Sequence, residues 1–423
     1  MKKVLIKNIS GQLIERFIGI SLKFLVSIYV IRYLGPSGIG VLSYSVSYVL
    51  LFSSLTTCGL QSIVIKEIVS KKYRVGNLMG SAFIIMLVGA TIAGVLSLTG
   101  AFILGDKSEV IAVIVFANIA NVVASFSIIN FYFQARMKSM YTSYVLLGQD
   151  IFDTVAQLSF VFLKLSVVFF GSLVLIENIF IYLVLYLIYS KAITREKWGY
   201  SWSLIKDLLR QSFPLAIAGA MISLYMRLDQ VMIEHYRGLS AVGEYSVGIK
   251  LAELLYLLPT IISANLFPGM VAKFEESKSK FDLYMIRIYG LLFYSSLVIA
   301  STIYFSAEYL VHLVYGDKYK IAGEVFQIGG FSLIAVFIGY INHLWLQIHG
   351  LQKYAVYITL SGLLCCFFVN LILIPRFGVI GAVFAMVLTQ SVASVFAFAL
   401  FPETRESFTL FLKGVFFRFA KST

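Results

Sequence analysis

Apolar stretches recur along the whole sequence, and each is close to the length that an α-helix needs to cross a lipid bilayer, about 20 residues. The chain is 60% hydrophobic, only 13% of its residues are charged, and its mean hydropathy is +0.90. Inside a bilayer the backbone polar groups must pair within the segment, which favours helices. The sequence therefore predicts an all-α, polytopic membrane protein. We place twelve transmembrane helices at 10–33, 39–64, 78–104, 109–133, 143–163, 167–190, 211–236, 241–268, 283–305, 323–348, 354–374 and 378–401.

Basic residues divide unevenly between the loops on the two sides of these helices. Of the 34 Lys and Arg residues, 23 fall on the side of both termini, 7 fall on the other side and 4 lie inside helices. Positively charged loops tend to stay in the cytoplasm, so this bias predicts that both termini are cytoplasmic. The same loops account for the net charge of +13, and we expect no nucleic-acid partner.

The longest loop between the predicted helices, 191–210, is also the most basic. We interpret it as a cytoplasmic linker between an N-terminal six-helix bundle, 1–190, and a C-terminal six-helix bundle, 211–401. The remaining residues, 402–423, form a basic and aromatic cytoplasmic tail that we expect to lie on the membrane surface.

Two internal matches lie at corresponding places in the two halves. Gly35 to Gly40 and Gly238 to Gly243, 203 residues apart, both read Gly-x-Ser-x-x-Gly between the first and second helix of a half. Gln134 to Tyr144 and Gln347 to Tyr357, 213 residues apart, share a Gln and two Tyr at the entry to the fifth helix. Together they predict a parallel repeat of six helices, an arrangement in which transporters bind substrate between the halves.

The four basic residues inside the predicted helices are Arg16, Lys23, Arg227 and Lys250. A charge near the bilayer centre costs at least about 2.5 kcal/mol, so such residues usually face protein or water and serve a function. With the polar stripes on helices 1, 2, 7 and 8, they predict a water-filled central cavity that attracts an anionic group. The alternative is that the charges pair off inside the bundle while the polar residues hold helices together.

Six acidic residues accompany these cations, as coupling sites or as ion-pair partners: Glu15, Asp150, Asp153, Glu177, Asp229 and Glu253. Buried carboxylates take up protons more readily than exposed ones, so Asp150, Asp153 and Glu177 are candidate proton or cation sites. Asp229 can tie helix 7 to a neighbouring helix, and Glu253 can neutralise Lys250 across one helical turn. Ordinary packing of these acids remains the alternative.

Sequence motifs of enzymes are missing from the chain. It contains no phosphate-binding Gly-x-x-x-x-Gly-Lys-[Ser/Thr] loop, no paired-Cys or His-x-x-x-His metal spacing and no Gly-x-Ser-x-Gly nucleophile motif. The linker and the tail are too short for a catalytic domain. We therefore expect no enzyme activity, no cofactor and no bound metal.

Several motifs resemble those of a known group of transporters. The segments that carry the resemblance are Arg32 to Gly40, Arg227 to Ile233, Val242 to Val247 and Leu251 to Pro268. In these, and in helix number and length, the chain is similar to the bacterial polysaccharide-repeat flippases, of O-antigen or capsule type. These belong to the multidrug/oligosaccharidyl-lipid/polysaccharide (MOP) exporter superfamily.

The resemblance implies a flippase in the bacterial cytoplasmic (inner) membrane. Its substrate would be an undecaprenyl-diphosphate-linked oligosaccharide, carried from the inner to the outer leaflet for surface polysaccharide or lipopolysaccharide synthesis. Two six-helix bundles would enclose a V-shaped cavity that opens alternately to each side, as in the MATE-like fold. Membrane lipids, a polysaccharide polymerase and a chain-length regulator are the implied partners. The related lipid II flippases carry two further helices, which argues against that assignment.

Two other functions remain open. A cation-coupled multidrug exporter of the same fold would favour an acidic, aromatic cavity, and a drug-resistance assay would distinguish it. A scaffold of the glycan assembly machinery that transports nothing would tolerate neutral replacement of all four buried cations.

Overall fold

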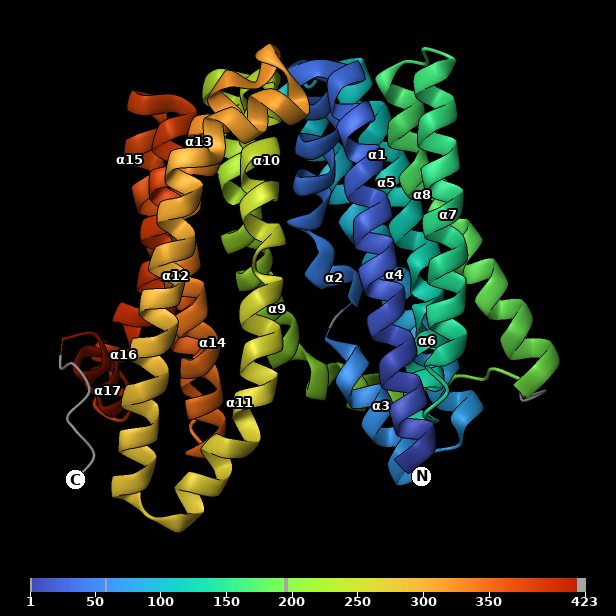
Figure 1. Ribbon diagram of the computed structural model, residues 1–423. Coiled ribbons are helices and arrows are strands. Elements are labelled where there is room, and N and C mark those ends of the chain that lie inside the picture. The colour runs from blue at the N-terminus through green and yellow to red at the C-terminus, as the bar shows by residue number, and fades with distance from the viewer. Residues whose placement is uncertain (1, 58, 194–196, 417–423) are drawn as a thin grey trace. The chain divides into compact units, whose positions relative to one another are not determined.

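The computed structural model describes residues 2–57, 59–193 and 197–416, with side chains for 19–57, 59–191 and 197–416. All regular structure in these ranges is helical (Figure 1). The all-α fold class predicted from the sequence is thus confirmed. The chain divides into two compact units, Met1–Arg227 (unit 1) and Leu228–Thr423 (unit 2).

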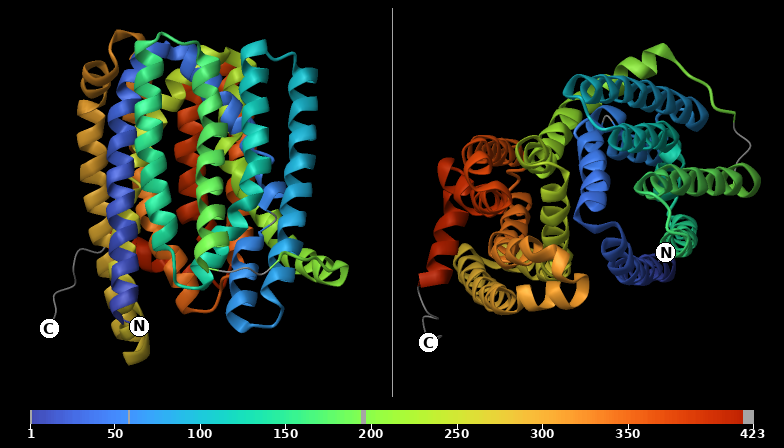
Figure 2. Two further views of the ribbon diagram at one scale, coloured as in Figure 1. Left: turned by 90° about the vertical axis from the view of Figure 1, so that its right-hand side faces the viewer. Right: turned by 90° about the horizontal axis from the view of Figure 1, so that it is seen from above.

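Unit 1 is a bundle of long apolar helices. Helix α1 packs against α5 and α7, and α8 packs against the same two helices. Figure 2 (left) shows α7 between α1 and α8. The elements of this unit are α1 (Lys2–Leu50), α2 (Ser53–Thr57), α3 (Leu60–Ser70), α4 (Val75–Leu104), α5 (Ser108–Val123), η1 (Ala124–Ser127), α6 (Ile128–Ala135), α7 (Met140–Phe162), α8 (Val167–Ile188), η2 (Tyr189–Ile193) and most of α9 (Trp202–Arg237).

Unit 2 is built around α12, which packs against α11, α13, α14 and α17 (Figure 1). Its aromatic core includes Tyr245, Tyr289 and Trp345, all almost fully buried. The elements are the end of α9, α10 (Leu239–Leu254), α11 (Leu257–Glu276), α12 (Lys278–Tyr315), η3 (Asp317–Tyr319), α13 (Lys320–Gly329), α14 (Ser332–Ile348), α15 (Tyr354–Ser391), η4 (Val392–Phe396), α16 (Ala397–Leu400) and α17 (Arg405–Phe416).

The membrane spans agree approximately with the predicted number. Among the described residues, nine helices are long and apolar enough to cross a membrane, and the pair α13 and α14, bent by 43°, makes a tenth. Two of the nine contain a sharp turn, α1 at Gly35 and α15 at Gly378. Dividing these two helices at their turns gives twelve spans. Both turns fall where the sequence predicts a boundary between two spans.

Several helices extend beyond the predicted ends. Helix α12 covers Lys278–Tyr315 where 283–305 was expected, and α9 begins at Trp202, inside the predicted linker 191–210. Hydropathy ends a span at charged residues, whereas helical hydrogen bonding continues past them. The part of the linker from Trp202 onward is therefore a helix, and its residues Leu204, Ile205 and Leu208 are buried in the core of unit 1.

Two predicted helices are interrupted. The span expected at 39–64 breaks after Leu50 and again at Gly59, which has a left-handed φ of 64°. The span expected at 241–268 breaks between α10 and α11, just before Pro259. Proline has no N–H to bond the carbonyl four residues earlier, so the kink predicted at Pro259 has a direct cause.

The two sequence matches have matching backbones. Gly35 (φ 66°, ψ 178°) and Gly238 (φ 80°, ψ 175°) adopt nearly the same conformation, which is essentially restricted to glycine. In the second match, Met137 (φ 55°) corresponds to Gly350 (φ 68°). The amide of each bonds the carbonyl three residues earlier, at 3.1 and 3.2 Å. These local geometries support the proposed repeat.

Candidate functional site

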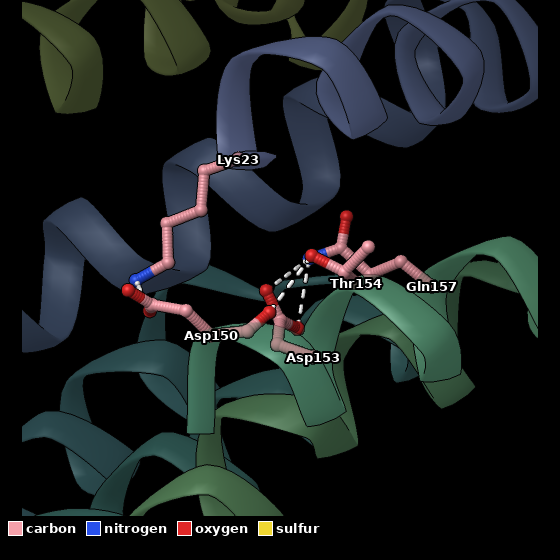
Figure 3. A network of polar contacts seen from close by, with 5 residues as sticks. All are labelled: Lys23, Asp150, Asp153, Thr154 and Gln157. Carbon is pink, nitrogen blue, oxygen red and sulfur yellow. Dashed lines mark hydrogen bonds and ion pairs between the residues drawn. The ribbon is translucent and has the colours of Figure 1, made fainter. Parts of the chain in front are cut away.

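The central feature of unit 1 is an ion pair between α1 and α7. The Nζ of Lys23 lies 2.7 Å from Oδ1 of Asp150 (Figure 3). The Asp150 side chain is only 6% exposed, whereas that of Lys23 is 49% exposed. A buried carboxylate therefore holds an ammonium group of which about half remains accessible.

A glycine on α1 makes room for this carboxylate. Gly19 precedes Lys23 by one helical turn, so both lie on the same face of α1. A Cβ atom at position 19 would lie 2.1 Å from Oδ2 of Asp150, which is far inside van der Waals contact. The hydroxyl of Thr154 bonds the backbone carbonyl of Asp150 at 2.8 Å on the other helix (Figure 3). Small residues and the i, i+4 spacing thus bring one charge of each sign together.

A second acidic group lies one turn further along α7. Asp153 is buried, and Nε2 of Gln157 donates to both of its carboxylate oxygens at 2.8 Å (Figure 3). Glu177, on α8, lies within hydrogen-bonding reach of Asp153 and interacts electrostatically with Lys23 and Asp150. Three of the six predicted acids and one predicted cation therefore form one cluster, contributed by α1, α7 and α8.

Unit 2 also contains a buried carboxylate, in a different setting. Asp229, near the end of α9, accepts a hydrogen bond from the hydroxyl of Tyr245 on α10. Its other oxygen accepts from the amide of Gln230 at 2.7 Å. Tyr245 is itself completely buried. Asp229 thus links α9 to α10 by a hydrogen bond, which is the packing role considered for this residue in the sequence.

The remaining predicted residues are dispersed. Arg227 is half-buried at the end of unit 1, and Lys250 is exposed on α10 with Glu253 half-buried one turn later. Glu15 and Arg16 lie in α1, but their side chains are outside the described residues. The structure brings together Lys23, Asp150, Asp153 and Glu177. It divides the four predicted cations between the two units.

Metal binding finds no support in the described part of the chain, where no three His, Cys, Asp or Glu residues are arranged to hold an ion. In unit 1 the position that a cation would take beside Asp150 is filled by the Lys23 ammonium group. The cluster is thus a network of one ammonium, three carboxyl groups and an amide.

Comparison with known families identifies the chain. The profile of a family described as polysaccharide biosynthesis protein matches residues 5–274, which is 270 of the 423 residues. This chain belongs to that family. It is also similar to two uncharacterized membrane proteins of Methanocaldococcus jannaschii. One is 26% identical over 221 residues (51% of this chain, 43% of the relative), the other 24% over 203 residues (47% and 46%). The matched part spans less than half the length of either relative.

Solved structures show that this family member has the fold of the MOP superfamily. An inward-facing multidrug resistance MATE family transporter superimposes with a TM-score of 0.70 at 15% identity, covering 93% of this chain and 95% of the other. The lipid II flippase MurJ, in an inward closed conformation, gives 0.72 at 14% identity, covering 96% and 90%. A MOP superfamily transporter from Pyrococcus furiosus gives 0.61 at 16%, covering 96% of each chain.

Two structurally important residues of this family member were missed by sequence reasoning. Tyr245 was noted only as part of a motif, and nothing in its spacing from Asp229 indicated a hydrogen bond between different helices. Glu244, in the same motif, accepts the backbone N–H of Ile321 at 2.8 Å and so caps the start of α13. A carboxylate at a helix N-terminus satisfies otherwise unpaired amides, but the helix that it caps is 77 residues away in sequence.

Proposed function

We propose that this protein is a flippase for lipid-linked oligosaccharides. Its substrate would be an undecaprenyl-diphosphate-linked repeat unit, moved from the cytoplasmic to the outer leaflet of the inner membrane by alternating access. The product would supply O-antigen or another surface polysaccharide. The observation that carries the proposal is a half-exposed ammonium group, Lys23, held by a buried carboxylate in a member of the polysaccharide biosynthesis protein family.

Lys23 has the chemistry that a diphosphate requires. Its ammonium group keeps three hydrogen-bond donors, and Asp150 uses only one side of it. A diphosphate carries more negative charge than one carboxylate, so it can compete for Lys23 when it enters. Asp150 then serves as the resident counter-ion that keeps the ammonium group oriented and compensated while the site holds no substrate. The lipid tail would remain in the bilayer throughout.

The neighbouring acids suggest how transport is driven. Two carboxyl groups within hydrogen-bonding reach of each other can bond only if one of them holds a proton. Asp153 already accepts from Gln157 at both of its oxygens, so we assign the coupling proton to its neighbour Glu177. Lys23, already paired with Asp150, leaves less room for a sodium ion in the same cluster.

Arg16, Arg227 and Lys250 complete the proposed set of cations that receive the diphosphate. Glu15, Asp229 and Glu253 act in this view as counter-charges, and the Tyr245 bond gives Asp229 a structural part. Both termini would be cytoplasmic, as the distribution of basic loops predicts. A polymerase and a chain-length regulator would receive the product on the outer side.

A cation-coupled multidrug exporter is the second candidate, and one observation favours it. The unit 1 cluster contains three carboxyl groups and only one ammonium group, so it can attract a cationic drug. The two candidates predict opposite results for Lys23. Neutralising it should abolish diphosphate transport but should preserve or improve export of cations.

The test uses proteoliposomes with the full chain and purified undecaprenyl-diphosphate oligosaccharide. Accessibility of the sugar to an external glycosidase reports its transfer between leaflets. We expect Lys23→Ala to remove transfer and Lys23→Arg to retain part of it. Lys66→Ala, which removes an exposed lysine from α3, is the matched control and should transfer normally.

The same variants are then expressed in a strain whose own flippase is deleted. Loss of surface glycan at an unchanged protein level is the expected outcome for Lys23→Ala. Normal glycan with this variant would reject the assignment of Lys23. Resistance to cationic drugs without any glycan phenotype would favour the exporter. Glycan restored by variants at all four cations would favour the scaffold.

A further inference from the structure

Each unit of the chain carries one amphipathic helix that lies on its own bundle. The first covers 202–213, at the start of α9, and the second is α17, Arg405–Phe416. Their first residues are 203 residues apart, the same offset that relates Gly35 to Gly238. The two helices therefore occupy equivalent positions in the proposed repeat.

Both helices are firmly attached along one face. In unit 1, Leu204, Ile205 and Leu208 enter the hydrophobic core. In unit 2, the hydroxyl of Ser407 bonds Oδ1 of Asn342 at 2.8 Å and lies 2.7 Å from the hydroxyl of Tyr289. Each docked face fixes the direction in which the opposite face points.

The opposite faces are exposed at the same five positions. At 100° per residue these positions fall within one 100° arc of each helix. In the first helix the stripe consists of Trp202, Lys206, Leu209, Arg210 and Phe213, and in the second of Arg405, Thr409, Leu412, Lys413 and Phe416, all of them exposed. The terminal Phe residues are 66% and 75% exposed.

The composition of the two stripes indicates which kind of surface they contact. Each has two cations, and each places an exposed Leu and an exposed Phe directly beside a basic residue. A helix lying in a membrane interface needs this combination, because its apolar side chains enter the acyl region while its cations meet the headgroups. Acidic headgroups attract such cations more strongly than zwitterionic ones.

We infer that both stripes are interfacial contact sites for anionic lipid headgroups, one for each unit. The composition of the stripes favours a lipid surface over a protein partner. The last three positions are apolar, basic and apolar in both stripes: Leu209 and Leu412, Arg210 and Lys413, Phe213 and Phe416. Exposed Leu and Phe side chains beside a cation suit acyl chains and charged headgroups, whereas the core of a protein interface is depleted of charged residues. This inference is independent of the transported substrate.

The first test measures quenching of Trp202 by brominated lipids in nanodiscs containing the full chain. Brominated phosphatidylglycerol and brominated phosphatidylcholine are compared at equal mole fraction. Subtracting the signal of Trp202→Phe removes the contributions of Trp198 and Trp345. We expect the anionic lipid to quench at least about twofold more strongly, since each cation near a charged surface favours acidic lipid severalfold.

Removing the stripe cations then tests whether they cause the preference for anionic lipid. Lys206→Gln with Arg210→Gln should bring the quenching ratio to about one, because the stripe then has no cation to attract acidic lipid. Lys66→Gln with Lys71→Gln removes two exposed lysines outside the stripe and should leave the ratio unchanged. Thermal melting of each variant confirms that it is folded, and Lys206→Arg with Arg210→Lys should keep the preference.

The second stripe is tested with Phe416→Trp in the Trp202→Phe background, with and without the pair Arg405→Gln and Lys413→Gln. We expect the same quenching ratio between the two lipids, and a ratio of about one when both cations are removed. An equal effect of both lipids on the parent protein would overturn the inference, as would a preference that survives removal of the stripe cations. Absence of quenching by either lipid would also overturn it, because the stripes would then not contact the membrane.

Discussion

Buried carboxylates in the two units are stabilised by different kinds of partner. In unit 1, Asp150 faces the ammonium group of Lys23, which remains half-exposed. In unit 2, Asp229 accepts hydrogen bonds from a fully buried tyrosine and from a backbone amide. A charged partner can be exchanged for another ion, whereas a buried phenol has no competitor. The first arrangement suits a site that binds and releases, and the second suits a fixed joint between helices.

The comparison also shows that the two halves of the proposed repeat share turn glycines but not charged residues. Position 23 of the first half corresponds, at the offset of 203, to Met226, and Asp229 corresponds to Val26. The turn glycines are equivalent, but the charges are not. In the proposed repeat, the backbone conformation of the turn is shared while the charged side chains differ.

The largest expected effect follows from the unequal burial of Lys23 and Asp150. Lys23→Ala leaves a buried carboxylate without its counter-ion, which should destabilise the protein by about 2 kcal/mol after allowance for the exposed ammonium group. Asp150→Ala leaves an ammonium group that water can reach, so its cost should be within about 1 kcal/mol. Thermal unfolding of the purified variants in detergent measures both.

The double variant separates stability from transport. Adding Asp150→Asn to Lys23→Ala removes the unpaired charge and should recover most of the lost stability. It should not recover transfer of the lipid-linked oligosaccharide, because the cation is still missing. Equal losses for Lys23→Ala and Asp150→Ala would contradict the proposed asymmetry.

The unit 2 pair should show the opposite balance between stability and transport. Tyr245→Phe removes the hydroxyl donor from a buried carboxylate, at a cost of about 1–2 kcal/mol. Because Asp229 acts here as a structural joint, transfer per folded molecule should change little. Comparing melting temperature with transfer rate tests this. A large loss of transfer at unchanged stability would instead place Asp229 among the transport residues.

Hydropathy and glycine spacing were sufficient to predict the fold class, the approximate span number and the turns at Gly35 and Gly238. They reflect local requirements, namely bilayer thickness and positive φ, that each segment must meet by itself. The partners of Lys23 and Asp229 could not be chosen in the same way. Each lies on another helix, 127 and 16 residues away, and pairing depends on packing that one sequence does not encode locally.

A second tyrosine and aspartate pair, whose carboxyl group lies outside the membrane spans, shows the effect of partial burial. The hydroxyl of Tyr44 lies 3.4 Å from Asp106, in the short connection between α4 and α5. Burial raises the pKa of Asp106 above its ordinary value of 3.8, and the hydrogen bond from Tyr44 partly opposes this. The folded state therefore holds this proton more tightly than the unfolded state does.

The stability of the folded state should therefore depend on pH through Asp106. The contribution of Asp106 favours folding below pH 3.8 and is lost as the pH rises through the raised pKa. Asp106→Asn should remove this decline, so its melting temperature should fall less than that of the parent between acidic and neutral pH. Tyr44→Phe should raise the pKa of Asp106 further and enlarge the decline. Parallel melting curves for all three proteins would contradict this.

The smallest effect concerns the backbone that the two units share. Met137 adopts a left-handed φ of 55°, which costs a residue with a Cβ roughly 1–2 kcal/mol, whereas the equivalent Gly350 does not carry this cost. Met137→Gly should stabilise the protein by at most about 1 kcal/mol, because glycine also loses more entropy on folding. The Cβ added by Gly350→Ala would have no atom within 4 Å. Any loss of stability would therefore come from the left-handed φ at this position and not from a steric clash. Opposite shifts in melting temperature for these two variants would show that the turn is equivalent in both halves, and shifts of the same sign would show that it is not.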